Sequence, residues 1–340
     1  MVTQELPAAA PPALLTTIPL PAPPTPLTGR VFVTGGAGFL GRALIRRAKR
    51  EGWNCRFLVF SRDEEKHRLV RERYGTDVEC YLGDVRDYHA LTTLMMGCET
   101  VIHAAAVKFV PDAEQNVWDT AKVNIDGIRN VVRAAAQCRI RRLVFISTDK
   151  ACAPQNVYGM TKALGERLVG EANRWREPIH TVSVRYGNVI GSTGSLLPMF
   201  AEQRAKYGKL RVTDREMTRF WLSPDDAVNT ILVALDEAER SPGAVVVTPA
   251  PAMRIYDIAQ AVGGPDTPIE ITGLRAGEKI HEHLVLLAES ARVREQGGFY
   301  VLKRQALRAD GPPWEYRSDA PVRWLTPEEL LAITEDARTI

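Results

Sequence analysis

A glycine-rich turn after a short apolar run constrains the fold of this chain most. The segment Thr34-Gly-Gly-Ala-Gly-Phe-Leu-Gly41 places glycines at 35, 38 and 41, directly after Val31-Phe-Val33. Glycines at this spacing permit a tight turn and close backbone approach, and they leave the first N–H groups of a helix facing a pyrophosphate. The pattern predicts a dinucleotide-binding strand–turn–helix unit.

Short apolar runs alternate with longer amphipathic stretches from residue 30 to residue 185. Runs of this length and composition are typical of buried parallel strands. Strands are expected over 31–33, 55–60, 78–82, 101–103, 143–146 and 181–184, and helices over 40–50, 117–137 and 158–175. The alternation predicts an α/β fold with a doubly wound parallel Rossmann sheet.

The rhythm changes after residue 185, which predicts a second, smaller α/β region. We expect a Rossmann domain over 29–185 with 223–248 returning to it, because Ser223-Pro-Asp-Asp226 is typical of a capped helix start. A C-terminal substrate domain is expected from 186–222 and 249–340, with a helix starting at Glu278. The Ala/Pro-rich residues 1–28 are expected to form an extended, disordered tail.

Composition narrows the class of protein. A net charge of +3 over 340 residues, without a long block of one sign, gives no reason to expect a nucleic-acid partner. Five cysteines without Cys-x-x-Cys spacing argue against a disulfide framework or zinc site and favour a reducing compartment. Prolines interrupt the apolar residues near the start, so neither a signal peptide nor a membrane span is expected. We therefore expect a cytoplasmic protein with no metal and no membrane partner.

Residues at the ends of the predicted strands are the expected cofactor contacts. The second strand ends Phe60-Ser61-Arg62-Asp63, and an arginine there accepts a 2′-phosphate whereas an acid holds ribose hydroxyls. Ser61 and Arg62 thus favour NADP over NAD; in the alternative interpretation, Arg62 faces solvent and Asp63 caps the next helix. The other expected contacts are Gly35, Gly38, Phe39, Leu40, Asp84, Val85, Ala104 and Ala105.

The segment 147–162 carries five groups that exchange protons. Thr148, Asp149 and Lys150 follow an apolar strand, and Tyr158 and Lys162, four residues apart, share one helical face. The Lys162 ammonium is expected to favour ionisation of the Tyr158 phenol, by a pKa shift of about 1–3 units. Such a tyrosine removes the proton of an alcohol that a nicotinamide oxidises. An acid beside a second base has a use only if water is then eliminated.

These segments resemble the extended short-chain dehydrogenase/reductases. Within them, residues 147–151 and 156–162 resemble the nucleotide-sugar dehydratases that act on UDP-N-acetylglucosamine, and the pattern is most similar to the inverting 4,6-dehydratases of pseudaminic acid and related glycan pathways. Further matches are at 185–189, 213–214, 217–221 and 273–279. Ala276 stands where that group commonly has proline.

The resemblance implies an NADP-dependent UDP-N-acetylglucosamine 4,6-dehydratase, a lyase, that inverts C5. Tyr158 and Thr148 would bind the C4 hydroxyl, Lys150 would remove the C5 proton, and a protonated Asp149 would protonate the departing C6 hydroxyl. As a base Lys150 must be neutral, which requires its pKa to fall from about 10.4 to roughly 7–8. Burial beside a cationic nicotinamide is expected to supply that shift.

The resemblance also implies a UDP-N-acetylhexosamine site. Arg219 is expected on the diphosphate and Glu278 on a ribose, with Asn188, Arg275, Lys108 and Thr213 as further substrate contacts. We expect a homo-oligomer, a dimer or larger. A retaining 4,6-dehydratase and a UDP-N-acetylhexosamine 4-epimerase remain as alternatives, with an NADP-sensing regulator as the non-enzyme alternative.

Overall fold

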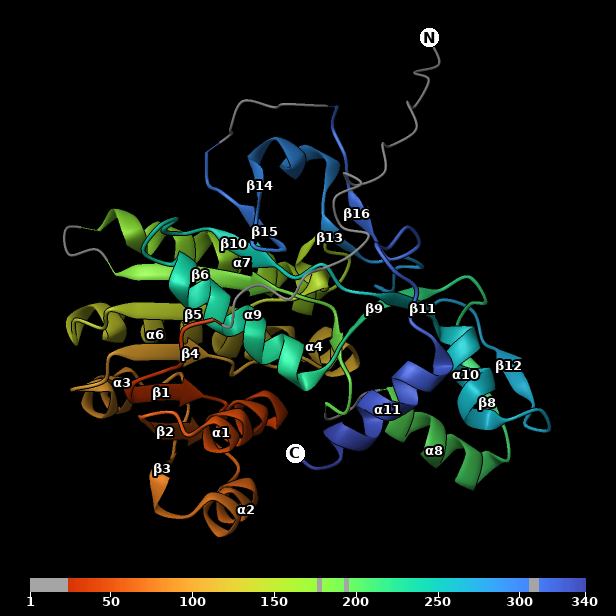
Figure 1. The fold of residues 1–340 in the computed structure, drawn as a ribbon, viewed down its shortest axis with the longest axis horizontal. Coiled ribbons are helices and arrows are strands. Elements are labelled where there is room, and N and C mark those ends of the chain that lie inside the picture. The colour runs from red at the N-terminus through yellow and green to blue at the C-terminus, as the bar shows by residue number, and fades with distance from the viewer. Residues whose placement is uncertain (1–23, 176–178, 193–195, 306–311) are drawn as a thin grey trace.

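A nine-stranded sheet lies at the centre of the chain in its computed structural model (Figure 1). The structure describes residues 24–175, 179–192, 196–305 and 312–340. The strand order is β14-β15-β10-β6-β5-β4-β1-β2-β3, and all strands from β10 to β3 run parallel. These parallel strands are β1 (Gly29–Thr34), β2 (Cys55–Ser61), β3 (Val78–Leu82), β4 (Thr100–His103), β5 (Arg142–Ile146), β6 (His180–Arg185) and β10 (Val245–Val247). The predicted doubly wound parallel sheet is confirmed.

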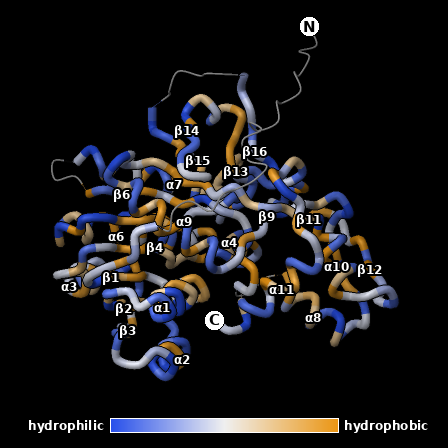
Figure 2. Tube along the Cα trace, viewed as in Figure 1, coloured by the Kyte–Doolittle hydropathy of each residue, from blue (hydrophilic) through white to orange (hydrophobic). Residues whose placement is uncertain are grey.

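Helices cover both faces of this sheet, which explains the continuous apolar runs of its strands. Along β1, Val31 and Val33 belong to one hydrophobic core while Phe32 belongs to the other. The first core is closed by α1 (Phe39–Glu51), α2 (Glu64–Tyr74) and α9 (Pro224–Glu237); the second by α3 (Tyr88–Met95), α6 (Gly127–Gln137) and α7 (Val157–Glu171). Figure 2 shows the hydrophobic residues gathered along the central strands.

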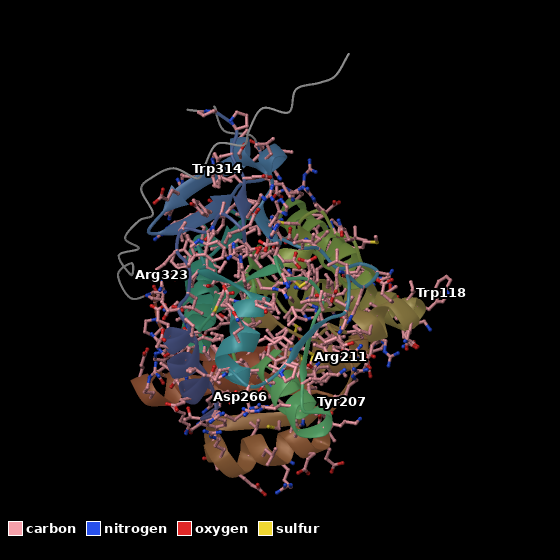
Figure 3. The ribbon with its side chains drawn as sticks, turned by 90° about the vertical axis from the view of Figure 1, so that its right-hand side faces the viewer. Trp118, Tyr207, Arg211, Asp266, Trp314 and Arg323 are labelled. Carbon is pink, nitrogen blue, oxygen red and sulfur yellow. The ribbon has the colours of Figure 1, made fainter. Side chains whose placement is uncertain are left out.

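The smaller region packs beside the carboxyl ends of the strands. Its short sheets include one formed by β7 (Asn188–Val189), β9 (Thr218–Leu222) and β11 (Ala252–Arg254), and another formed by β8 (Leu210–Val212) with β12 (Ile269–Ile271). Its helices are α8 (Leu196–Tyr207), α10 (Ile255–Gly263) and α11 (Pro327–Ala337). Figure 3 looks onto this region, where Tyr207, Arg211 and Asp266 lie at the outer surface.

Several segments differ from the prediction. The predicted helix 117–137 is divided by a π turn into α5 (Val117–Ala121), η3 (Lys122–Asp126) and α6. Residues assigned to the smaller region form β14 (Val293–Gln296) and β15 (Phe299–Leu302), which extend the main sheet. β15 runs antiparallel to β10, and β14 runs antiparallel to β15. The expected tail lies outside the described residues up to residue 23, and Leu27, near its end, is buried in the core.

The helix predicted to start at Glu278 is wrong. A loop leads instead into β13 (His283–Val285), which pairs with β16 (Tyr316–Arg317). The remaining short elements are α4 (Val110–Gln115), η2 (Gly75–Asp77), η4 (Asp149–Ala151), η5 (Ala172–Arg174) and η6 (Leu287–Arg292). Among the helices that the structure describes, none combines the length and apolar character that a membrane span needs.

Candidate active site

The predicted reactive groups meet where β5 ends and α7 begins. Thr148 and η4 follow β5 directly, and Tyr158 and Lys162 lie on α7. Asn156 caps α7, since its side chain accepts a hydrogen bond from Gly159 N at 2.8 Å. A Cβ atom at Gly159 would lie 2.2 Å from the carbonyl oxygen of Lys150. The absence of a side chain there therefore lets the first turn of α7 pack against η4 and brings Tyr158 to Thr148.

Thr148, Asp149 and Lys150 form a connected polar group. The Thr148 hydroxyl donates to Asp149 Oδ1 at 2.9 Å, and Lys150 Nζ donates to the same oxygen at 3.1 Å. Asp149 is fully buried, and its second oxygen, Oδ2, has no hydrogen-bond partner within the described ranges of the chain. Buried polar atoms are nearly always paired, so this oxygen is suited to a ligand.

Lys150 faces a carboxylate that the sequence argument did not consider. Burial alone would lower the pKa of Lys150, but the carboxylates of Asp149 and Glu282 outweigh it and raise that pKa well above its usual value. The sequence argument weighed burial and the nicotinamide, and it did not include Glu282. Without a bound ligand, Lys150 is an ammonium ion.

The pKa of Tyr158 also moves opposite to expectation. Burial raises the pKa of Tyr158 to about 12, against the opposing effects of the Lys150 charge and the Thr148 hydroxyl. Lys162 donates to Ile146 O at 2.7 Å and lies 4.5 Å from the ring centre of Phe145. Burial lowers the pKa of Lys162 to about 7. The cation that favours the Tyr158 phenolate here is thus Lys150.

Glu282 is a site residue that the sequence reasoning missed. Its Oε1 lies 3.4 Å from Lys150 Nζ, its Oε2 lies 2.6 Å from Lys279 Nζ, and the side chain is buried. The neighbouring His281 and His283 contact Thr218 and Glu315. The available signal was a glutamate three residues after Lys279, where the family-like segment 273–279 ends.

Arg219 belongs to the same buried group. Its guanidinium donates to the carbonyl oxygens of Thr218 at 2.7 Å, Ile280 at 3.0 Å and Lys279 at 2.9 Å, and its Nε lies 3.9 Å from Glu282. These hydrogen bonds, with the pairing of β13 and β16, stabilise a loop after Glu278 in place of the expected helix. Arg219 therefore has internal partners at the position where a diphosphate contact was expected.

The other expected substrate residues lie around this group. Arg275 is exposed, and its backbone N–H donates to Glu278 Oε2 at 3.1 Å within one tight turn. Asn156 Nδ2 donates to Gly277 O at 2.9 Å, which ties this turn to the start of α7. Of the remaining three, Asn188 lies on β7, the Thr213 hydroxyl faces Met217 Sδ at 3.2 Å, and Lys108 lies in the exposed loop after β4.

The turn between β1 and α1 forms a cradle without side chains. Gly35 has a φ of 68°, and a Cβ atom there would lie 2.9 Å from Ala105 N. The N-cap of α1 is Gly38, no side chain among the residues that the structure describes caps it, and its first turn carries no acid. The N–H groups of this turn are therefore available to an anion. Phe39 and Leu40 follow in that first turn, and Ala104 and Ala105 face it across the sheet edge.

The end of β2 shows how the expected phosphate contacts lie. Asp63 caps α2 by accepting from Lys66 N at 3.0 Å, as the alternative interpretation stated. Ser61 shares a hydrogen bond of 2.7 Å with His67 Nε2. Arg62 is largely exposed and lies 3.8 Å from Asp84, which follows β3 and precedes the buried Val85. Asp63 is thus committed to a helix, whereas Arg62 remains accessible to a ligand.

Comparisons with known proteins agree with this architecture. A family model described as polysaccharide biosynthesis protein matches residues 31–304. The chain is 34% identical over 325 residues to a Campylobacter jejuni protein named UDP-N-acetylglucosamine 4,6-dehydratase (inverting), covering 89% of this chain and 96% of that protein. It is 33% identical over 315 residues to a Rickettsia prowazekii protein named UDP-glucose 4-epimerase, covering 90% and 89%.

A solved structure is also similar over nearly its whole length. Pen from Bacillus thuringiensis superposes with a TM-score of 0.82 at 28% sequence identity, covering 92% of this chain and 98% of that one. Together with the family match over most of the sequence, this shows that the chain belongs to the polysaccharide biosynthesis protein family of extended short-chain dehydrogenase/reductases.

Proposed function

We propose that this chain is an NADP-dependent UDP-N-acetylglucosamine 4,6-dehydratase that forms a UDP-4-keto-6-deoxy-N-acetylhexosamine with inversion at C5. One observation carries the proposal: a buried carboxylate and an amine, Asp149 and Lys150, are in contact beside Thr148 and Tyr158. Oxidation of C4 needs only the tyrosine side of this arrangement. Elimination of water between C5 and C6 needs both an acid and a base.

The residues present fit a nicotinamide dinucleotide. The uncapped start of α1 suits its pyrophosphate, and Arg62 suits a 2′-phosphate because its contact with Asp84 is long, at 3.8 Å. When bound, the nicotinamide supplies acceptance of the C4 hydride and its return to C6. Tyr158 and Thr148 would hold the C4 hydroxyl, and Lys162 would lie beside the nicotinamide ribose.

The ionic state of the Asp149–Lys150 pair is compatible with acid–base work. A carboxylate and an ammonium together hold one transferable proton. If that proton moves from Nζ to Oδ1, across 3.1 Å, an N–H bond breaks, an O–H bond forms, and the pair becomes a neutral amine beside a carboxylic acid. The amine then takes the C5 proton while the acid's proton leaves with the C6 hydroxyl as water. The pair returns to its ionic form with atoms and charge balanced.

The substrate assignment rests on the turn that holds Arg275 and Glu278 near α7, and on the similarity to the C. jejuni protein. Inversion is proposed because that relative's name includes it. A 4-epimerase is the second candidate, since the R. prowazekii relative is named as one. An epimerase would leave the C6 hydroxyl in place and would not require Asp149 as an acid.

Turnover of UDP-N-acetylglucosamine in D₂O, followed by NMR, tests the proposal. We expect a 4-keto-6-deoxy product of arabino configuration with deuterium at C5. A product of unchanged C5 configuration would indicate the retaining reaction, and a C4 epimer that keeps its C6 hydroxyl would indicate an epimerase. If no UDP-N-acetylhexosamine is dehydrated, the proposal is wrong.

A further inference from the structure

Glu282 is a buried carboxylate that reaches Lys150 from a distant part of the chain. It lies in the loop before β13, and its Oε1 is 3.4 Å from Lys150 Nζ, close to the 3.1 Å that separates this amine from Asp149 Oδ1. Lys150 thus lies between two carboxylates, only one of which is adjacent in sequence. A buried carboxylate costs free energy unless it is paired, so its presence beside the base requires a reason.

Three independent contacts hold Glu282 in place. Lys279 Nζ lies 2.6 Å from its second oxygen and also donates to Cys152 O at 2.8 Å, just after η4. Arg219, on β9, lies 3.9 Å from Oε1. The backbone N–H of Glu282 donates to Ser318 Oγ at 2.8 Å. The carboxylate is therefore a fixed group that the smaller region presents to the reactive pair.

The charges that face Lys150 come from four segments. Asp149 and Glu282 are negative, Arg219 and Lys279 are positive, and the Tyr158 phenol is neutral because burial raises its pKa. Arg219 and Lys279 offset part of the Glu282 charge. The net effect on Lys150 is still to favour its ammonium form, which is the form that donates to Asp149.

We propose that Glu282 is a positioning residue for Lys150. It holds the Lys150 ammonium group against Asp149, so that the Asp149–Lys150 pair still carries its one transferable proton when substrate binds. This inference rests on the proposed function of Lys150 as the C5 base. Without Glu282, the amine would lose its proton to solvent at lower pH, and Asp149 would then have no proton to give to the leaving hydroxyl.

The protonation of Lys150 is measurable without turnover. Trace acetic anhydride acylates only neutral amines, so the acetylation of Lys150 relative to the exposed Lys122 in the same sample, read by mass spectrometry, reports its neutral fraction. Replacing Glu282 by Gln removes one opposite charge, which typically changes a pKa by about 1–3 units. We expect labelling of Lys150 in Glu282→Gln to rise by about 10-fold or more, since one pKa unit is a tenfold change in the ratio of the two forms.

Matched variants separate charge from structure. Glu282→Asp keeps the charge and should keep labelling near the wild-type level, and Glu270→Gln removes a negative charge from an exposed strand and should have no effect. Lys279→Gln removes a charge that offsets Glu282 and should lower labelling, an opposite change that also tests the proposal if Glu282→Gln fails to fold. Unchanged labelling in folded Glu282→Gln, or in Lys279→Gln, would overturn it.

The pH dependence of C5 deuterium exchange links this result to the reaction. In Glu282→Gln we expect the loss of exchange at high pH to begin about 1–3 units lower than in wild type. If wild type dehydrates no UDP-N-acetylhexosamine, the proposed function fails while the labelling result still stands. If wild type is active and the variant shows neither changed labelling nor a changed pH profile, only the inference about Glu282 fails.

Discussion

Replacement of Asn156 tests whether one side chain joins the catalytic helix to the substrate loop. Asn156 Oδ1 accepts from Gly159 N at 2.8 Å, and its Nδ2 donates to Gly277 O at 2.9 Å. The first contact caps α7 directly before Tyr158. The second holds the turn that contains Arg275 and Glu278.

Two substitutions at Asn156 separate the effects of these contacts. Asn156→Ala removes both: loss of the cap costs about 1 kcal/mol, and loss of the second hydrogen bond costs about 0.5–1.5 kcal/mol. We therefore expect the free energy of unfolding to fall by roughly 2 kcal/mol. Asn156→Ser keeps a capping hydroxyl but is too short to reach Gly277 O, so its loss should be about 1 kcal/mol.

Urea denaturation and steady-state kinetics with UDP-N-acetylglucosamine would separate these effects. Both variants should raise KM by about fivefold, since each loses about 1 kcal/mol of the free energy that holds the turn in place. The decrease in kcat should be larger in Asn156→Ala than in Asn156→Ser, because Tyr158 follows the lost cap. The reasoning is refuted if Asn156→Ala unfolds at the wild-type urea concentration, or if Asn156→Ser binds substrate as wild type does.

Three further predictions concern the reactive residues. Lys150→Ala should lower kcat by about 10²–10⁴-fold, the usual contribution of a general base, with NADP affinity by fluorescence titration unchanged; near-normal dehydration would remove Lys150 from the mechanism. Arg62→Ala should raise KM for NADP by about tenfold or more, as expected for a lost charge-assisted hydrogen bond. Replacing Arg68, an exposed arginine on α2, by Ala should leave this KM unchanged. Equal effects of the two substitutions would argue against the phosphate contact. The pKa of Lys162 falls from 10.5 to about 7 on folding, so between these pH values the unfolded chain holds one more proton than the folded chain. The free energy of unfolding of the wild type should therefore rise with pH across that window, and Lys162→Met should lose this part of the rise. Parallel urea-derived stability curves at pH 7 and 9.5 would contradict the last expectation.

The inner parallel strands of the main sheet were predictable because helices bury them on both faces. The strand expected over 55–60 contains the buried apolar run 57–60, and its ends in the structure, Cys55–Ser61, differ by one residue. The capped start of α9 at Ser223 is equally local, since the capping partners lie within one turn. Patterns of this kind depend on neighbours in sequence, so the sequence contains them.

The errors in the site arose from contacts between distant segments. The helix expected from Glu278 is replaced by a loop whose Lys279 and Ile280 carbonyls accept hydrogen bonds from Arg219, on β9. The charges around Lys150 were incompletely identified because Glu282 approaches from the other region. No local pattern reports which buried charges meet, and a pKa depends on all of them.

The position of β15 beside β10 has a consequence for the order in which the protein is made. Synthesis proceeds at roughly 5–20 residues per second, and segments fold as they emerge. A nascent chain that ends after β10 contains all the parallel strands and the cradle at α1. Its β10 edge is unpaired, and an unpaired strand edge is a template for pairing with other chains. In such a chain, Glu282 has not yet been made and cannot contact Lys150. We therefore expect the dinucleotide cradle to form before the chemical centre, so that a chain interrupted before β13 would bind nucleotide while releasing no dehydrated sugar.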